Sequence, residues 1–404
     1  MLDNVNLTQA QKTLFQLIGQ ELFSAPIEIC NDVNWYTVVQ ESMIHGVILL
    51  AFKNHNTLPL DKETVAYLQK CSRKCTLGNM NCFNGHQYLN ELMTKNNIPY
   101  CFLKGVASAR YYPDPFLRSM GDVDFYIPPE HVARAREVLS ADGFKWEDND
   151  HPHHFGLKKE TMYMELHFAP IAIPNDSMRP IFLEYWSDIC DKATKISDGL
   201  FEYVMPSDFH HGFILLTHLQ SHMIRSGIGL RHVCDWAVFA NSFSNEDFIA
   251  IFEKKLKRAG VWRLAQILAL MSVKYFGMPY KIWMGEDYAT ADALIEEIIR
   301  RGNLGRHEKG QGYETLFIAD NSVISTNKPR CIRVFLSLNM IIRQHWKAAK
   351  KCPLLYPVGW IYFSSRFLFR MMRGKRKADF VSSYKKSGKR IKLYNSLKLF
   401  VPEE

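Results

Sequence analysis

The chain of 404 residues lacks the marks of several broad protein classes. It has no internal repeat and no low-complexity tract, and 47% of its residues are hydrophobic while 23% are charged. This balance is typical of a folded globular protein and excludes a disordered or fibrous chain. Residues 1–19 lack the basic start and apolar core of a secretory signal, so we expect a cytoplasmic protein. The length leaves room for two or three domains.

The cysteines form no evident disulfide framework. The nine cysteines are scattered and odd in number, which predicts reduced thiols rather than a set of disulfides. Cys71 and Cys75 have a spacing that would suit two metal ligands. Since a zinc site needs a second pair nearby and none follows, we expect no metal there.

The C-terminal part of the chain is strongly basic, and it lacks a long apolar run. Residues 328–404 contain 19 Lys and Arg against 3 acids, a net charge of +16, whereas residues 1–327 carry −7. The uncharged run of residues 352–365 is 14 residues long and contains two prolines. A membrane-spanning helix needs about 20 apolar residues, so this run is not expected to cross a bilayer.

The tail segment of residues 353–377 is instead predicted to be an amphipathic helix. Its basic stripe consists of Arg366, Arg370, Arg373 and Lys377, and its apolar face contains Trp360, Ile361, Phe367, Leu368, Met371 and Met372. Such a helix suits an anionic membrane surface or a nucleic acid. A third interpretation is a helix docked on the protein body with its charges in water. The sequence does not choose among the three.

Hydrophobic periodicity predicts an α+β protein, with a small α/β unit flanked by helical regions. We expect an N-terminal helical region at residues 1–97 and an α/β core at residues 98–205. They are followed by a helical domain at residues 206–327 and by the basic tail at residues 328–404. Asn and Pro after residue 95 mark the end of the first region.

Two carboxylates lie one residue apart in the predicted strand of residues 122–127, "DVDFYI". Strand alternation turns Asp122 and Asp124 to one face and the apolar residues to the other. Burying an unpaired carboxylate is costly, so something must compensate these charges. A hard divalent cation such as Mg²⁺ prefers oxygen ligands of this kind. For this pattern alone, the alternative is that the strand ends in solvent and the two aspartates are exposed there.

A third carboxylate follows on the predicted strand of residues 161–168, "TMYMELHF". Alternation places Tyr163, Glu165 and His167 on one face of that strand. Three acids from neighbouring strands predict a site for two Mg²⁺ ions, one aligning an attacking hydroxyl and one holding a triphosphate. Without metal the three carboxylates would raise one another's pKa values.

The order of "LKG", "YYPDP", "LRSMGDVDFYI" and "MELHF" resembles the nucleotidyltransferase superfamily, the fold of DNA polymerase beta, over roughly residues 40–260. It is most similar to the bacterial branch called uncharacterised nucleotidyltransferase. The resemblance implies a small mixed sheet, and it implies transfer of a nucleoside monophosphate from a nucleoside triphosphate, for example ATP, to an acceptor hydroxyl or amine. It implies that Asp122 and Asp124 bind metal and that Glu165 deprotonates the acceptor or completes the metal site. Neither the acceptor nor the base preference can be deduced, and a catalytically silent relative that binds through the basic tail is the alternative.

Phosphate binding is predicted around the glycine turn. Gly105 offers bare backbone N–H groups at the start of a helix, and Lys104 and Arg118 add positive charge. The alternative for Lys104 is a side chain that reaches the surface. The alternative for Arg118 is an ion pair with Asp114 or with the acidic cluster.

Histidines are concentrated in two segments. His211, His218 and His222 share one face of a predicted helix by their spacing, which suits either a zinc site or the wall of a nucleotide cleft. The resemblance implies that His222, Arg231 and Asp235 form a hydrogen-bonded set against the sheet, with substrate contact by His222 as the second interpretation. Residues 151–154 contain three histidines that are expected to be an ordinary polar loop.

Overall fold

The structure is a computed structural model of the chain. It describes residues 5–147, 153–170, 173, 177–197, 199, 201–305, 307, 332, 335–336, 338–339, 342, 346, 348–349, 352–372, 380–399 and 401–403.

The N-terminal region is helical, as predicted. Its elements are α1 (Gln9–Phe23), α2 (Trp35–His45), α3 (Ile48–Ala51), the 3₁₀ turn η1 (His55–Thr57) and α4 (Lys62–Lys95). Side chains of Thr8, Asn34 and Asp61 accept hydrogen bonds from backbone N–H groups and so begin α1, α2 and α4. Gly46 adopts φ +69° and ends α2 before α3 begins.

A five-stranded mixed sheet follows, with strand order β1-β2-β5-β4-β3. Its strands are β1 (Cys101–Phe102), β2 (Val123–Tyr126), β3 (Lys145–Trp146), β4 (His154–Lys159) and β5 (Met162–His167). β2 and β5 are parallel, and the other neighbours are antiparallel. The α+β class with a small mixed sheet is therefore confirmed. Three strands were not predicted from the sequence: β3, and β6 (Thr194–Ser197) and β7 (Glu202–Met205), which form a separate hairpin.

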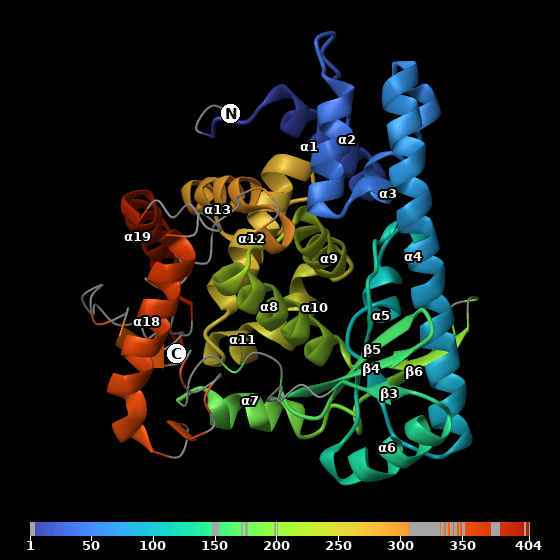
Figure 1. Cartoon of the computed structure of the whole chain (residues 1–404). Coiled ribbons are helices and arrows are strands. Elements are labelled where there is room, and N and C mark those ends of the chain that lie inside the picture. The colour runs from blue at the N-terminus through green and yellow to red at the C-terminus, as the bar shows by residue number, and fades with distance from the viewer. Residues whose placement is uncertain are drawn as a thin grey trace.

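Short helical segments connect and cover the strands. They are α5 (Val106–Ala109), η2 (Pro115–Leu117), η3 (Pro129–His131), α6 (Val132–Ala141) and α7 (Arg179–Trp186). The long helix α4 runs beside the sheet in Figure 1. Its C-terminal half contributes Phe83, Leu89 and Met93 to a core that also contains Val123 and Phe125 of β2. One face of β2 is thereby held in the core, and the other face is left for Asp122 and Asp124.

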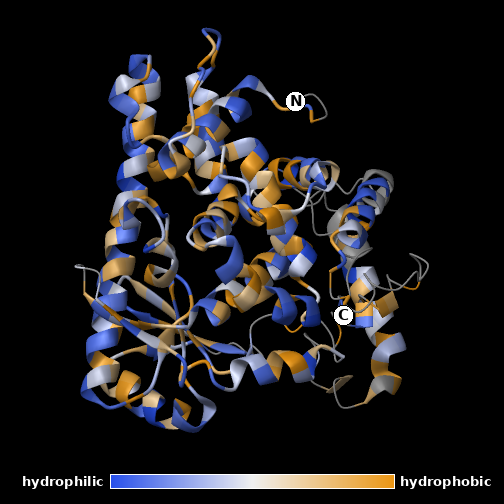
Figure 2. Ribbon diagram, turned by 180° about the vertical axis from the view of Figure 1, so that it is seen from behind, coloured by the Kyte–Doolittle hydropathy of each residue, from blue (hydrophilic) through white to orange (hydrophobic). Residues whose placement is uncertain are grey.

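The second half of the chain is helical, as predicted. It contains α8 (Asp208–Arg225), α9 (Leu230–Asn241), α10 (Asn245–Phe248), the π-helical turn η4 (Ile249–Glu253), α11 (Lys254–Arg258), α12 (Trp262–Phe276), η5 (Ile282–Met284), α13 (Tyr288–Arg301) and η6 (Asn303–Gly305). Hydrophobic residues are frequent in the central helices of Figure 2, whereas hydrophilic and hydrophobic turns alternate along α4. A large core joins these helices to α1, α2 and α3.

The tail contains η7 (Pro353–Leu355), α18 (Tyr356–Met372) and α19 (Phe380–Ser396). α19 docks on the body, because Tyr394 and the nearby Leu397 are fully buried in the large core. Arg390 on the same helix is 1% exposed, donates to the carbonyl oxygens of Met223 and Ile224, and lies 2.9 Å from Glu297. α19 follows the segment of residues 353–377, so its docking does not decide among the three interpretations given for that segment.

α18 differs from α19, because it presents apolar side chains to solvent. The exposed residues in and just before it are Leu354, Val358, Ile361, Tyr362 and Phe369. In the part of the chain that the structure describes, no helix is long and apolar enough to cross a membrane. Arg373 and Lys377 of the predicted basic stripe lie outside the described residues.

Truncating Leu397 to Ala should destabilise the protein by about 2–5 kcal/mol, because it leaves a cavity in the large core. The matched control is Leu354→Ala, whose side chain is 87% exposed and should change stability by less than about 0.5 kcal/mol. Chemical denaturation of the full-length chain measures both. Equal stability of the two variants would mean that residues after α19 do not pack on the body.

Candidate active site

Three carboxylates meet where β2 and β5 lie side by side. The parallel register places Asp124 directly opposite Glu165, and Asp122 precedes β2 on the same face. Oxygen atoms of the three carboxylates lie within 4.8 Å of one another. The strands that the alternation predicted thus bring the three predicted acids together.

Asp124 is the most deeply buried of the three, with 3% of its surface exposed. Its Oδ2 lies 2.9 Å from Nζ of Lys104, and its Oδ1 lies 3.0 Å from Nε2 of His167. Burial alone would raise the pKa of Asp124, but Lys104 and His167 together lower it well below its ordinary value. Asp124 is therefore ionised at neutral pH.

Asp122 is in the opposite situation. Within the described residues its carboxylate has no ion-pair partner inside 4 Å, and its nearest charges include Asp124. Repulsion from Asp124, together with burial, raises the pKa of Asp122 to about 6. The acid cluster therefore carries more negative charge than its protein partners neutralise, which is the condition that a bound cation relieves.

Glu165 lies between the acids and two histidines. Its Oε2 is 3.6 Å from Nε2 of His167 and 3.8 Å from Nδ1 of His154. Burial, the largest single cause, works to raise the pKa of Glu165, but the contacts with His167 and His154 together lower it below the ordinary value. Hydrogen bonds to Asp124 and Glu165 in turn outweigh burial and raise the pKa of His167.

These side chains line a pocket of about 510 Å³ between the sheet and helices α8 and α9. Its charged and imidazole side chains are Lys104, Arg118, Asp122, Asp124, His153, His154, Glu165, His167, His218, His222, Arg225, Arg231, His232 and Asp235. The apolar part of the wall includes Met120, Leu215 and Leu304. All seven residues predicted from the sequence, Gly105 included, lie in this wall.

Lys104 and Gly105 form the turn after β1. The alternative of a surface lysine is wrong, because the Lys104 side chain is 12% exposed and its Nζ also lies 2.9 Å from Nε2 of His218. Gly105 adopts φ +64° and passes so close to His86 that a Cβ atom would lie 2.1 Å from its ring. Only glycine fits this turn. The following helix α5 has a single turn, so it adds little dipole for an anion.

Arg118 forms a buried bidentate ion pair, and its partner is neither Asp114 nor the acidic cluster. Its Nε and Nη2 each donate to Asp235 on α9 at 2.8 Å. Tyr112 also donates to Asp235, at 2.8 Å. The proposed pairing with Asp114 is therefore wrong, because that carboxylate caps the turn at Phe116 instead. Most of the Arg118 guanidinium group therefore holds the loop before β2 against α9.

The α8 histidines divide into two groups. His218 and His222 line the pocket, and their Nε2 atoms are 3.0 Å apart. Burial is the main cause that lowers the pKa of both, to about 4 for His222. His211 faces away from the pocket, toward Tyr111 and Ser108, so the three do not form one metal site.

His218, which the helical spacing had placed on one face with His222, lies in the pocket wall and contacts Lys104. Other pocket residues were not predicted as functional from the sequence. Among them, His167 contacts two of the acids, and its place on the same strand face as Glu165 was the available signal. His154, which we expected in an ordinary loop, is the first residue of β4, and the antiparallel register that places it near Glu165 could not be read from the sequence.

Comparison with known proteins gives one match. A family model described as "Uncharacterised nucleotidyltransferase" matches residues 31–277, a range that includes the three acids and every pocket residue except Leu304. No curated protein and no solved structure matches the chain.

Asp122→Asn should stabilise the metal-free protein at pH 8 and leave it unchanged at pH 4. A carboxyl whose pKa rises to about 6 on folding contributes stability below its ordinary pKa and loses that contribution as pH rises through 6. The amide removes the repulsion from Asp124, which should raise the free energy of unfolding at pH 8 by an amount of the order of 2 kcal/mol. Denaturation in EDTA at both pH values measures this, and a parent as stable as the variant at pH 8 would contradict it.

Proposed function

Since the chain belongs to the uncharacterised nucleotidyltransferase family, we propose that it transfers a nucleoside monophosphate from a nucleoside triphosphate to an acceptor hydroxyl or amine. The observation that carries the proposal is the convergence of Asp122, Asp124 and Glu165 within 4.8 Å in the wall of a pocket that also contains lysine and arginine side chains. Such a site provides negative charge for metal and positive charge for phosphate side by side.

Magnesium fits this donor set, because all three groups are carboxylates and Asp122 lacks a cationic partner among the described residues. Asp122, Asp124 and Glu165 would hold it, with room for two ions. When bound, Mg²⁺ supplies charge neutralisation at the phosphate oxygens and activation of the acceptor oxygen. Lys104 and His167 keep Asp124 ionised and fix both of its oxygens.

Glu165 was predicted either to deprotonate the acceptor or to complete the metal site. A carboxylate whose pKa is lowered is a weak base at neutral pH but remains an anionic ligand. We therefore propose that Glu165 is chiefly a metal ligand. His167, held between Glu165 and Asp124, orients both carboxylates.

The triphosphate is proposed to lie along the part of the wall that carries basic side chains. Lys104, next to the Gly105 turn, contacts both Asp124 and His218, and His222 lies beside His218. Arg231 is a further candidate, because its Nε is buried without a hydrogen-bond partner among the described residues while its Nη1 donates to the carbonyl of Ser119. Arg118 plays a smaller part than predicted, since Asp235 occupies its Nε and Nη2.

Replacing Asp124 by Asn should weaken Mg²⁺-dependent binding of ATP at least tenfold, because it removes one charge from the metal site. Glu165→Gln should weaken the same binding to a similar degree if it is a ligand. The control is Glu130→Gln, an exposed acid shortly after β2, which should bind like the parent. Calorimetry with ATP, GTP, CTP and UTP, with and without Mg²⁺, measures the affinities and the base preference.

Two results would change the proposal. Full affinity with loss of transfer in Glu165→Gln would make this residue the base. A parent that binds no nucleoside triphosphate with Mg²⁺ would favour the catalytically silent alternative.

We further propose that α18 contacts an anionic membrane surface, so that the protein is cytoplasmic and peripheral. Support comes from the exposed apolar residues on this helix and from the net charge of +16 in residues 328–404. Apolar side chains insert at the lipid interface, and clustered cations are attracted to acidic headgroups.

We also propose that the chain divides into regions at residues 97, 205 and 327.

Ile361→Glu should reduce sedimentation of the protein with acidic liposomes severalfold, because a charged side chain replaces an inserted one. The matched control is Ile282→Glu, since Ile282 is 76% exposed and Ile361 is 73% exposed, but Ile282 lies on η5. Equal sedimentation of the two variants would contradict the proposal. Salt-sensitive binding to short RNA in place of liposomes would favour a nucleic acid partner.

A further inference from the structure

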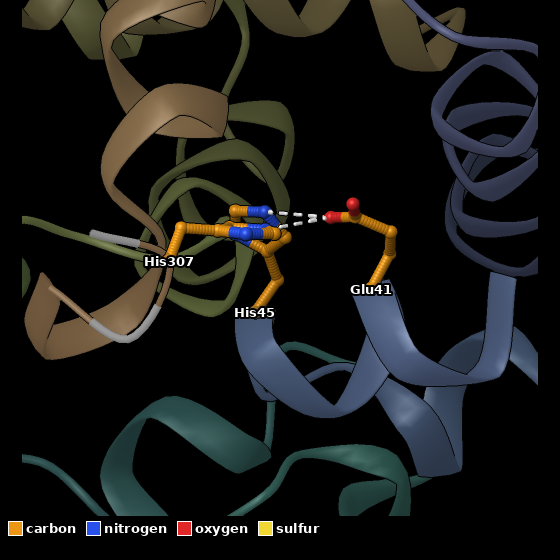
Figure 3. A group of neighbouring side chains, drawn as sticks. All are labelled: Glu41, His45 and His307. Carbon is orange, nitrogen blue, oxygen red and sulfur yellow. Dashed lines mark hydrogen bonds and ion pairs between the residues drawn. The ribbon is translucent and has the colours of Figure 1, made fainter. Parts of the chain in front are cut away.

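A second group of potential metal ligands lies outside the active-site pocket. Figure 3 shows Glu41 and His45 on α2 facing His307, which follows η6. None of the three belongs to the pocket wall, and His307 lies beyond the part of the chain that the family model matches. The function proposed above gives these residues no role.

The three side chains converge on one point. Nε2 of His307 lies 3.0 Å from Oε2 of Glu41, and Nε2 of His45 lies 3.6 Å from the same oxygen. The ligand atoms all lie within 4.8 Å of one another. In a tetrahedral zinc site with bonds of about 2.0–2.2 Å, ligand atoms are roughly 3.3–3.5 Å apart. Small side-chain adjustments would therefore suffice to surround an ion.

His45 is the observation that points most directly to a ligand. It is fully buried, and neither of its ring nitrogens has a hydrogen-bond partner within the described part of the chain. A buried polar group without a partner is unfavourable, so such groups normally have a bonding role. Its Nε2 is aimed at the Glu41 carboxylate, as Figure 3 shows.

The ionisation states suit metal binding. Burial raises the pKa of Glu41, but the hydrogen bond with His307 and the proximity of His45 lower it to about 2, so Glu41 is an anion. Burial lowers the pKa of His45, which favours the neutral imidazole that binds metals.

The backbone allows the segment that carries His307 to pack closely against α2. Glu41 and His45 are four residues apart on α2 and so share one face. Gly302 has φ +67°, and a Cβ atom there would lie 2.8 Å from Ile44 and 3.0 Å from the His307 ring. The N–H of His307 donates to the carbonyl of Arg301. The segment that carries His307 is thus held against α2.

We propose that Glu41, His45 and His307 bind one transition-metal ion of the zinc class. Two imidazoles and one carboxylate are a recognised zinc donor set, and a fourth position can be taken by water. Water can reach it because the His307 side chain is 26% exposed. The donors differ from the three carboxylates of the active site, so the two sites select different cations.

Such an ion would connect parts of the chain that are distant in sequence. His307 follows Leu304, which lines the active-site pocket and whose N–H donates to the carbonyl of Gly227. The ion would fix this wall of the pocket to α2 and raise the stability of the folded state by mass action. This proposal does not depend on the transferase proposal.

The test uses full-length protein stripped with EDTA, incubated with zinc chloride and desalted, with metal content measured by mass spectrometry. We expect about one equivalent in the parent and none at this site in His307→Ala, whose partly exposed position should tolerate the change. His131→Ala is the matched control, because His131 is another histidine in a polar surface turn. Glu165→Gln separates this site from the active-site cluster and should keep the equivalent.

Cobalt substitution and thermal melting give independent readouts. Parent protein should show the visible absorption of tetrahedral Co²⁺ and a melting temperature raised several degrees by zinc, and His307→Ala should show neither. Circular dichroism checks that the variant is folded. Zinc content equal in His307→Ala and the parent would overturn the proposal, as would loss of the bound zinc in Glu165→Gln alone.

Discussion

An ionised carboxylate buried in the protein, Asp124, is the constraint around which the site is organised. With 3% of its surface exposed, its charge must be neutralised by the protein. Lys104 comes from the turn after β1 and His167 from the last residue of β5, so both compensating groups depend on strand register. A register slip by one residue would reverse each strand's faces and bury Asp124 without partners. The sheet and the charge balance of the site thus stabilise each other.

A second buried charge pair joins the sheet to the helical half. Arg118 lies on the loop before β2, Asp235 lies on α9, and the two are 117 residues apart in sequence. Breaking a buried pair by removing one partner is strongly destabilising, because the other charge stays buried. Tyr112 donates to the same carboxylate. This pair positions the loop that precedes the acids, which explains why an arginine beside the site has a scaffold role.

The sequence predicted those features that depend on local pattern. Helical periodicity predicted α1 and α4, and strand alternation placed Asp122, Asp124 and Glu165 on one side of the sheet. Features that depend on which elements pack together could not be predicted. The partner of Arg118 and the contact of Lys104 with Asp124 arise only when distant segments meet. β3 has two residues, which are too few to show a period. Glu41 and His45 had the right helical spacing, but nothing in the sequence pointed to His307.

The helix α4 has a mechanical consequence. It is continuous over 34 residues, or about 51 Å at 1.5 Å per residue. Leu68 near its start belongs to the large helical core, and Leu89 near its end belongs to the core of the sheet. A continuous helix anchored in both cores resists a hinge-like opening of the two cores relative to each other. For the nucleotide proposed to bind in the pocket, entry and exit would then depend on loops and side chains at the pocket mouth.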